Sequence, residues 1–170
     1  MTLRDKIFSF RGRLRRRDYW LISLAIGIPL FFVTDLLRLA LFGPETSMLV
    51  SGFDGLKAAG LDSRCRWLTQ ALSLAAFWPS LAMSAKRAHD RDTGARPILA
   101  MLVVVQLIEF GHQIFGRNSP FTGGLIGSLI VSVISLYLFV VVGCLDGTRG
   151  PNRYGPSPKG GDGDLASTFD

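Results

Sequence analysis

The sequence is poor in the residues on which metalloenzymes, thiol enzymes and secreted disulfide proteins depend. Its 170 residues include two cysteines, Cys65 and Cys144, and two histidines, His89 and His112. Two cysteines are too few for a disulfide scaffold or a metal knuckle, and two histidines do not fill a zinc site of the usual kind. The sequence therefore predicts neither a metal centre nor another cofactor.

Charged residues are also scarce, at 19% of the chain against 48% hydrophobic residues, and they are unevenly placed. Seven of the 19 lysines and arginines fall within the first 18 residues, while long stretches elsewhere carry almost none. This segregation excludes an ordinary soluble globule and a disordered chain. It also argues against a nucleic-acid partner, despite the net charge of +6, because no folded domain would position the arginines on a duplex.

Four long apolar segments predict an all-α membrane protein with four transmembrane helices. A bilayer core needs about 20 mostly apolar residues per helix. Lipid offers no partners for backbone polar groups, so each segment must be helical. The predicted spans are residues 19–42, 67–85, 98–115 and 123–145, which form one transmembrane domain from residue 19 to residue 145.

The distribution of basic residues predicts the orientation of these spans. The termini and the loop between the second and third spans contain 14 lysines and arginines, whereas the other two loops contain four. Loops rich in lysine and arginine stay in the cytoplasm, so both termini are predicted to be cytoplasmic. The cytoplasmic parts are then a basic segment (residues 1–18), a Gly/Pro turn motif (146–158) and a tail (159–170) that we predict to be disordered.

The first of three cytoplasmic motifs is FSFRGRLRRRDYW, residues 8–20. Its aromatic side chains suit the headgroup level of a bilayer, and its arginines suit anionic lipid. The motif therefore predicts membrane anchoring, with a cytoplasmic docking surface as the alternative.

The second motif, KRAHDRD, occupies residues 86–92 between the second and third spans. A carboxylate beside an imidazole, as in His89-Asp90, can raise the basicity of the imidazole for acid–base or metal chemistry. The further ligands of a metal-dependent phosphohydrolase are missing, because His112 is expected near the opposite membrane face. We therefore expect a structural role, with Asp90 paired to Arg87 or Arg91 and His89 capping a helix end; a lipid-headgroup or proton-linked site is the alternative.

The third motif, DGTRGPNRYGPSP, follows the last span at residues 146–158. Its glycines and prolines impose tight turns where the helix must end. It is not a phosphate-binding P-loop, because Pro156 stands where that motif requires lysine. We expect this loop, with Asn152 and Tyr154, to fold back onto the His89 loop, since both are cytoplasmic.

Taken in order, the three motifs make the chain resemble the bacterial inner-membrane proteins grouped as domain of unknown function 805. The pattern of that family is F-x-G-R-x-x-R-x-x-Y-W, then R-R-x-H-D, then G-x-x-G-x-N-x-Y-G-x-x-P. Here it is matched from Phe10 to Trp20, from Lys86 to Asp90 and from Gly147 to Pro158. Lys86 replaces an arginine, and Gly94-Ala95-Arg96 replaces the usual S-G-W. The resemblance implies an integral inner-membrane protein and supplies no activity.

Four ionisable residues lie within the predicted spans. Asp35 and Arg38 are three residues apart on the first span, as are Glu109 and His112 on the third, so each pair shares a helix face. Ionisable groups inside a membrane are candidates for function. We hypothesise a polar cluster in which Arg38 pairs with Glu109 and Asp35 with His112; the alternative is that each side chain snorkels to the outer interface.

These patterns favour a non-catalytic membrane component whose basic cytoplasmic face binds anionic lipid or a partner protein. The residues predicted to form that face are Arg13, Arg16, Arg87, His89, Asp90, Asn152 and Tyr154.

Two alternatives remain open at this point. The first is a small oligomeric transporter or channel subunit that uses Asp35, Arg38, Glu109 and His112. Small residues four apart, as at Gly123 and Gly127, suit either contacts within the bundle or a homo-oligomer. The second alternative is a membrane enzyme working at His89-Asp90.

Overall fold

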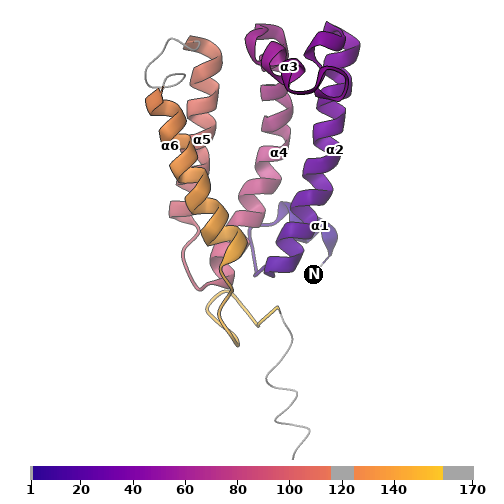
Figure 1. The fold of residues 1–170 in the computed structure, drawn as a ribbon. Helices are drawn as coiled ribbons and strands as arrows, with labels where there is room; N and C mark the ends of the chain where they lie inside the picture. The colour runs from indigo at the N-terminus through magenta and orange to yellow at the C-terminus, as the bar shows by residue number, and fades with distance from the viewer. Residues whose placement is uncertain (1, 116–124, 159–170) are drawn as a thin grey trace, which may run out of the picture. The chain divides into compact units, whose positions relative to one another are not determined.

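The computed structural model describes residues 2–115 and 125–158, and the predicted disordered tail lies outside the described residues. The described chain is helical and contains no strand, only an isolated bridge between Asn152 and Gly155, which confirms the all-α prediction. Figure 1 shows the helices in order. They are α1 (Leu3–Phe8), α2 (Arg16–Phe42), the 3-10 turn η1 (Pro44–Thr46), α3 (Met48–Leu61), α4 (Ser63–Asp90), α5 (Arg96–Phe115), α6 (Leu125–Leu138) and the π-helical turn η2 (Phe139–Cys144).

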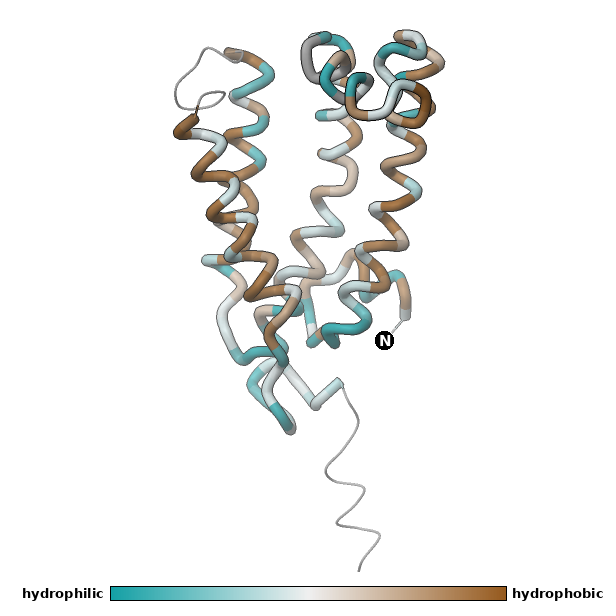
Figure 2. Tube along the Cα trace, viewed as in Figure 1, coloured by the Kyte–Doolittle hydropathy of each residue, from teal (hydrophilic) through white to brown (hydrophobic). Residues whose placement is uncertain are grey.

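Three helices in the described ranges are long and apolar enough to cross a membrane. They are α2, α5, and α6 continued through η2, and they correspond to the predicted spans 19–42, 98–115 and 123–145. The fourth predicted span, residues 67–85, lies in α4. This helix is long enough to cross a membrane, but Gln70, Ser73 and Pro79 interrupt its run of apolar residues, and it is not among the three. Figure 2 shows this difference, with brown over most of α2 and α6 and a paler α4.

The surfaces of these helices are apolar where a soluble protein would be polar. Large side chains such as Leu24 and Ile28 on α2, and Leu129 and Val133 on α6, are about half exposed or more. Exposed apolar surface of this extent is typical of helices that face lipid.

The chain divides into two compact units, each assembled from separate stretches of sequence. Unit 1 comprises Met1–Ile22, Pro79–Gln106 and Leu129–Asp170, and unit 2 comprises Ser23–Trp78 and Leu107–Ser128. The apolar core of unit 1 brings α4, α5, the end of α6 and η2 together through Ala88, Ile98, Leu138 and Val142. Unit 1 therefore contains all three sequence motifs, and unit 2 contains the ionisable residues predicted inside the membrane.

Candidate functional site

The centre of unit 1 is a buried aspartate held between two buried arginines. Asp90 Oδ1 lies 3.0 Å from Arg13 Nε, and Asp90 Oδ2 lies 2.8 Å from Arg87 Nη1. The three side chains are 4%, 2% and 0% exposed, respectively. A buried charge is tolerated only when it is paired and hydrogen-bonded, so these three residues depend on one another. We call them the arginine–aspartate node.

Backbone carbonyls accept most of the remaining hydrogen bonds of the node. Arg87 donates to Val142 O at 2.9 Å and to Leu145 O at 2.6 Å, at the end of η2. Arg13 donates to Thr148 O and to Gly150 O, both at 2.7 Å. The last carbonyls of a helix lack intrahelical partners, and Arg87 satisfies them here. The node thereby ties the first and second motifs to the turn motif.

The turn motif approaches Asp90 so closely that only glycine fits at residue 147. A Cβ atom on Gly147 would lie 1.9 Å from Asp90 Oδ2 and 2.8 Å from Asp90 O. Beside it, the Thr148 amide donates to Asp90 O at 2.8 Å. The glycine at the start of the third motif is therefore explained by packing against the node.

The predicted fold-back of the turn motif onto the His89 loop is confirmed. The rings of His89 and Tyr154 stack with centroids 3.9 Å apart and an interplanar angle of 11°. Asn152 Nδ2 donates to His89 O at 2.9 Å. Burial lowers the pKa of His89, so the imidazole is neutral at physiological pH and acts as a packing surface for Tyr154.

Lys86 connects the node region to α1. Its side chain is fully buried, and Nζ donates to the carbonyls of Asp5 and Lys6 near the end of α1. Burial lowers the pKa of Lys86 to about 8. A lysine near a helix C-terminus satisfies free carbonyls and complements the helix dipole.

The lowered pKa of Lys86 predicts that the protein gains stability as pH rises from about 8 to about 10.5. In that window the unfolded chain binds more protons than the folded chain, so the free energy of unfolding increases with pH. We expect the thermal midpoint in detergent to rise between pH 8 and pH 10 by more in the wild type than in Lys86→Met. If the thermal midpoints of the two proteins depended equally on pH, the lowered pKa of Lys86 would be wrong.

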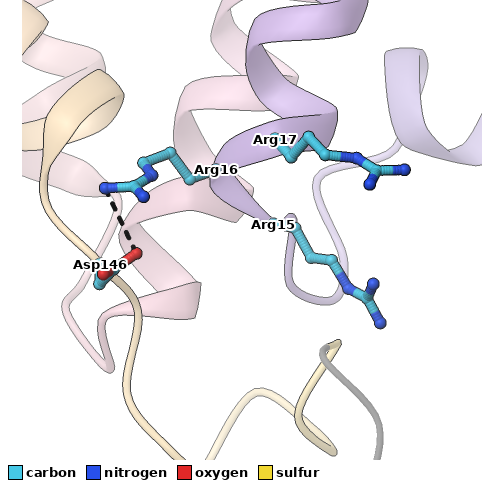
Figure 3. A pocket seen from close by; sticks show the side chains of 4 residues that line it. All are labelled: Arg15, Arg16, Arg17 and Asp146. Carbon is cyan, nitrogen blue, oxygen red and sulfur yellow. Dashed lines mark ion pairs between the residues drawn. The ribbon is translucent and has the colours of Figure 1, made fainter.

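Exposed cations surround the start of α2 rather than the node. Arg15, Arg16 and Arg17 are exposed and, with Asp146, line a hollow of about 220 Å³. Figure 3 shows Arg16 directed toward Asp146, with a separation of 3.6 Å between Nη1 and Oδ1, and Arg15 and Arg17 directed away from it. Arg15 Nε donates to Pro158 O. We call Arg15, Arg16 and Arg17 the arginine rim.

Unit 1 brings together all seven residues predicted for the cytoplasmic face, but it does not expose all of them. Arg13, Arg87 and Asp90 are buried in the node, whereas Arg16 is exposed. The other members are His89, Asn152 and Tyr154, which are partly buried in the turn-motif contact. Arg15 and Arg17 were not among the predicted residues, although three consecutive arginines before a long apolar run were the signal for an exposed basic rim.

In unit 2, the side chain of Asp35 is hydrogen-bonded to the start of α3. Its carboxylate accepts hydrogen bonds from Ser47 Oγ at 2.6 Å, from the Met48 amide at 2.8 Å and from the Leu49 amide at 3.0 Å. A carboxylate at this position satisfies free amides and complements the positive end of the helix dipole.

The hypothesised pairs Arg38–Glu109 and Asp35–His112 are not formed among the described residues. Arg38 donates to Thr69 Oγ1 at 2.6 Å and lies 4.0 Å from Asp35, while Glu109 is exposed. His112 is half-buried, and its Nδ1 atom has no described partner. Asp35 pairs locally because the start of α3 supplies three hydrogen-bond donors to its carboxylate, whereas the imidazole of His112 would supply one. Within residues 2–115 and 125–158, no three His, Cys, Asp or Glu side chains form a metal-binding group.

Comparison with known proteins places these motifs in a family. The family model described as "Protein of unknown function (DUF805)" matches residues 7–156. Inner membrane protein YhaH of Escherichia coli K12 is 31% identical over 151 residues, covering 89% of this chain and 88% of the relative.

Two further relatives come from the same organism. Inner membrane protein YhaI is 29% identical over 156 residues (90% of this chain, 88% of the relative), and uncharacterized protein YiiR is 28% identical over 156 residues (91% and 89%). No solved structure matches the chain.

Proposed function

Because this chain belongs to the DUF805 family and is an inner-membrane protein, we propose that it is a non-catalytic, four-span component whose cytoplasmic arginine rim binds anionic lipid headgroups. Three features support this proposal: the contacts at the two ends of α4, the distribution of basic residues, and the exposure of the rim. The observation that carries it is the rim itself, three exposed arginines in succession at the start of an apolar helix.

The contacts of α4 support a fourth span. In unit 1, the end of α4 lies at the start of α2, because Arg87 donates to Leu14 O at 3.3 Å. In unit 2, the start of α4 lies at the end of α2, because the Arg64 guanidinium lies 5.4 Å from the ring centroid of Phe42. These contacts, one at each end of α4, support the proposal that α4 is a fourth span.

The rim suits lipid headgroups because the start of a membrane helix lies at headgroup depth. Each lysine or arginine near an anionic membrane surface contributes about 1 kcal/mol of attraction. Arg13 and Arg87 are buried in the node, so the exposed arginines are the ones that can attract anionic headgroups. In this proposal the node is the structural support and the rim is the binding surface.

We expect Arg15→Gln/Arg17→Gln to lose most of the stabilisation that anionic lipid gives the protein. The protein is placed in nanodiscs of phosphatidylcholine with or without phosphatidylglycerol, and the free energy of unfolding is compared. The expected loss is about 2 kcal/mol, from two arginines at about 1 kcal/mol each.

The matched control removes two exposed cations from unit 2, Lys57→Gln/Arg64→Gln, and changes the net charge by the same amount. It should keep the full response to phosphatidylglycerol. If both double variants lost the response equally, the effect would be one of net charge, and the rim would not be the lipid site.

The proposed orientation predicts a specific pattern of cysteine labelling in spheroplasts. Cys65 is buried, which raises the pKa of its thiol, and Cys144 is exposed in unit 1 on the proposed cytoplasmic side. A membrane-impermeant maleimide should therefore leave the intact chain unlabelled and add one label after permeabilisation. A Lys57→Cys variant should be labelled in intact spheroplasts; labelling of Cys144 from outside would reverse the orientation.

A further inference from the structure

Arg38 in unit 2 has a buried hydrogen-bond donor that its surroundings do not satisfy. A guanidinium has five N–H donors, and Thr69 Oγ1 accepts from Nη2. The Nε atom is buried without a partner among the described residues. Asp35 forms an ion pair with Arg38 at 4.0 Å, beyond hydrogen-bond distance, and its oxygens accept hydrogen bonds from three donors at the start of α3 instead. The side chain is only 11% exposed, so water satisfies few of its remaining donors.

Arg38 forms one end of a groove between α2 and α4. The groove has a volume of about 310 Å³, and its lining changes from polar to apolar along α2. Next to Arg38 are hydroxyl groups of both helices, and farther along are apolar groups of α2 alone. The lining residues are Arg38, Thr34, Thr69 and Ser73 at the polar end, and Phe31, Leu30 and Gly27 at the apolar end.

The groove runs along the helix axis. Residues 27, 30, 31, 34 and 38 are spaced three or four apart, so they lie on one face of α2. From Arg38 to Gly27 is 11 residues, or about 16 Å at 1.5 Å per residue. That length is close to half of a hydrocarbon core about 30 Å thick, the depth that one lipid leaflet provides. Arg38 lies four residues before the end of α2 at Phe42, which places its charge near the interface.

We propose that this groove holds one anionic phospholipid, with its phosphate against Arg38 and one acyl chain along Phe31 and Leu30 to Gly27. The headgroup oxygens accept hydrogen bonds from the guanidinium, and Thr34, Thr69 and Ser73 line the polar end beside them. The acyl chain covers the apolar part of the groove. This site is separate from the arginine rim and does not depend on it.

The chemistry of the groove distinguishes this occupant from two others. An apolar helix of a second copy would fill the apolar end but would offer the buried guanidinium no acceptor beyond Thr69. A zwitterionic lipid would bring its own cation beside Arg38. A net negative headgroup on an acyl chain matches both ends.

The test counts lipids by native mass spectrometry in the Arg15→Gln/Arg17→Gln background, so that the rim does not contribute. Phosphatidylglycerol and phosphatidylcholine are titrated onto the full chain in detergent. We expect one phosphatidylglycerol to bind in preference to phosphatidylcholine. Adding Arg38→Gln should weaken its binding about tenfold or more, since charge-assisted hydrogen bonds are lost.

Gly27→Phe provides a second variant that leaves every charge in place. Gly27 lines the groove, and a Cβ added there meets no atom within 4 Å, so a side chain can be attached at this position without a clash at Cβ. This variant should also weaken binding of phosphatidylglycerol. Arg64→Gln, which removes an exposed arginine paired with Asp62 and not lining the groove, should leave it unchanged.

Four results would overturn the proposal. They are equal binding of the two lipids, phosphatidylglycerol binding that survives Arg38→Gln, an equal loss in Arg64→Gln, and a lipid-free dimer that Gly27→Phe abolishes. The last result would assign the groove to a second copy of the chain. None of these results decides the proposal for the arginine rim. That proposal is tested separately, in nanodiscs, with proteins that keep Arg38.

Discussion

Replacing Asp90 with asparagine should destabilise the folded protein by about 3–5 kcal/mol, the cost of breaking a buried ion pair from one side. Asp90 accepts from Arg13 at 3.0 Å and from Arg87 at 2.8 Å, and asparagine would leave both buried guanidinium groups without a counter-charge. The same change removes the support on which the three motifs converge. The measurement is the free energy of unfolding in mixed micelles.

Asp92→Asn is the matched control, because Asp92 is two residues away and also pairs with an arginine. Its contact with Arg153 is 3.2 Å long, but both side chains are about half exposed. An exposed pair contributes about 1 kcal/mol or less, so the control should lose little stability. Equal losses at residues 90 and 92 would mean that burial does not make the node critical.

Gly147→Ala is the second change with a large expected effect. The added Cβ would lie 1.9 Å from Asp90 Oδ2, so either the turn motif or Asp90 must move. Overpacking of this kind costs about 1–3 kcal/mol, and we expect the upper end because the displaced group is the carboxylate of the node. The measurement is again the free energy of unfolding, together with protection of the Thr148 amide from hydrogen exchange.

Gly94→Ala serves as the control for Gly147→Ala. A Cβ at residue 94 meets no atom within 4 Å, and the substitution should be neutral or slightly stabilising. If Gly147→Ala were equally harmless and kept the Thr148 amide protected, the close approach of the turn motif to Asp90 would be wrong.

The sequence predicted the helices well because apolar length and charge segregation are local signals. It also predicted that Asp90 pairs with Arg87 or Arg91, and the structure shows the pair with Arg87, which lies three residues away on the same helix face. The contact of Asp90 with Arg13 joins residues 77 apart in the chain. No local periodicity indicates such a contact, so Arg13 was assigned to a surface although it is buried.

For the intramembrane residues the error is the reverse: for Asp35 the sequence predicted a contact between spans, and the structure shows a local one. The hypothesis paired Asp35 and Arg38 with the third predicted span, because those were the ionisable groups expected at similar depth. Asp35 instead caps α3, a helix in the connection between the first and second predicted spans. The first backbone amides of a helix are free hydrogen-bond donors whatever the side chains are, so the amino-acid composition does not reveal a partner of this kind. Because the Asp35 oxygens accept from these donors, Arg38 keeps a buried Nε atom without a hydrogen-bond partner among the described residues.

The measurement that most directly tests the central claim is native mass spectrometry of the protein released gently from its own membrane. The account predicts anionic phospholipid bound in stoichiometric amount, with fewer lipids retained by Arg15→Gln/Arg17→Gln and the full number retained by Lys57→Gln/Arg64→Gln. A stoichiometric protein partner in place of lipid, or a lipid count unchanged by loss of the rim arginines, would contradict it.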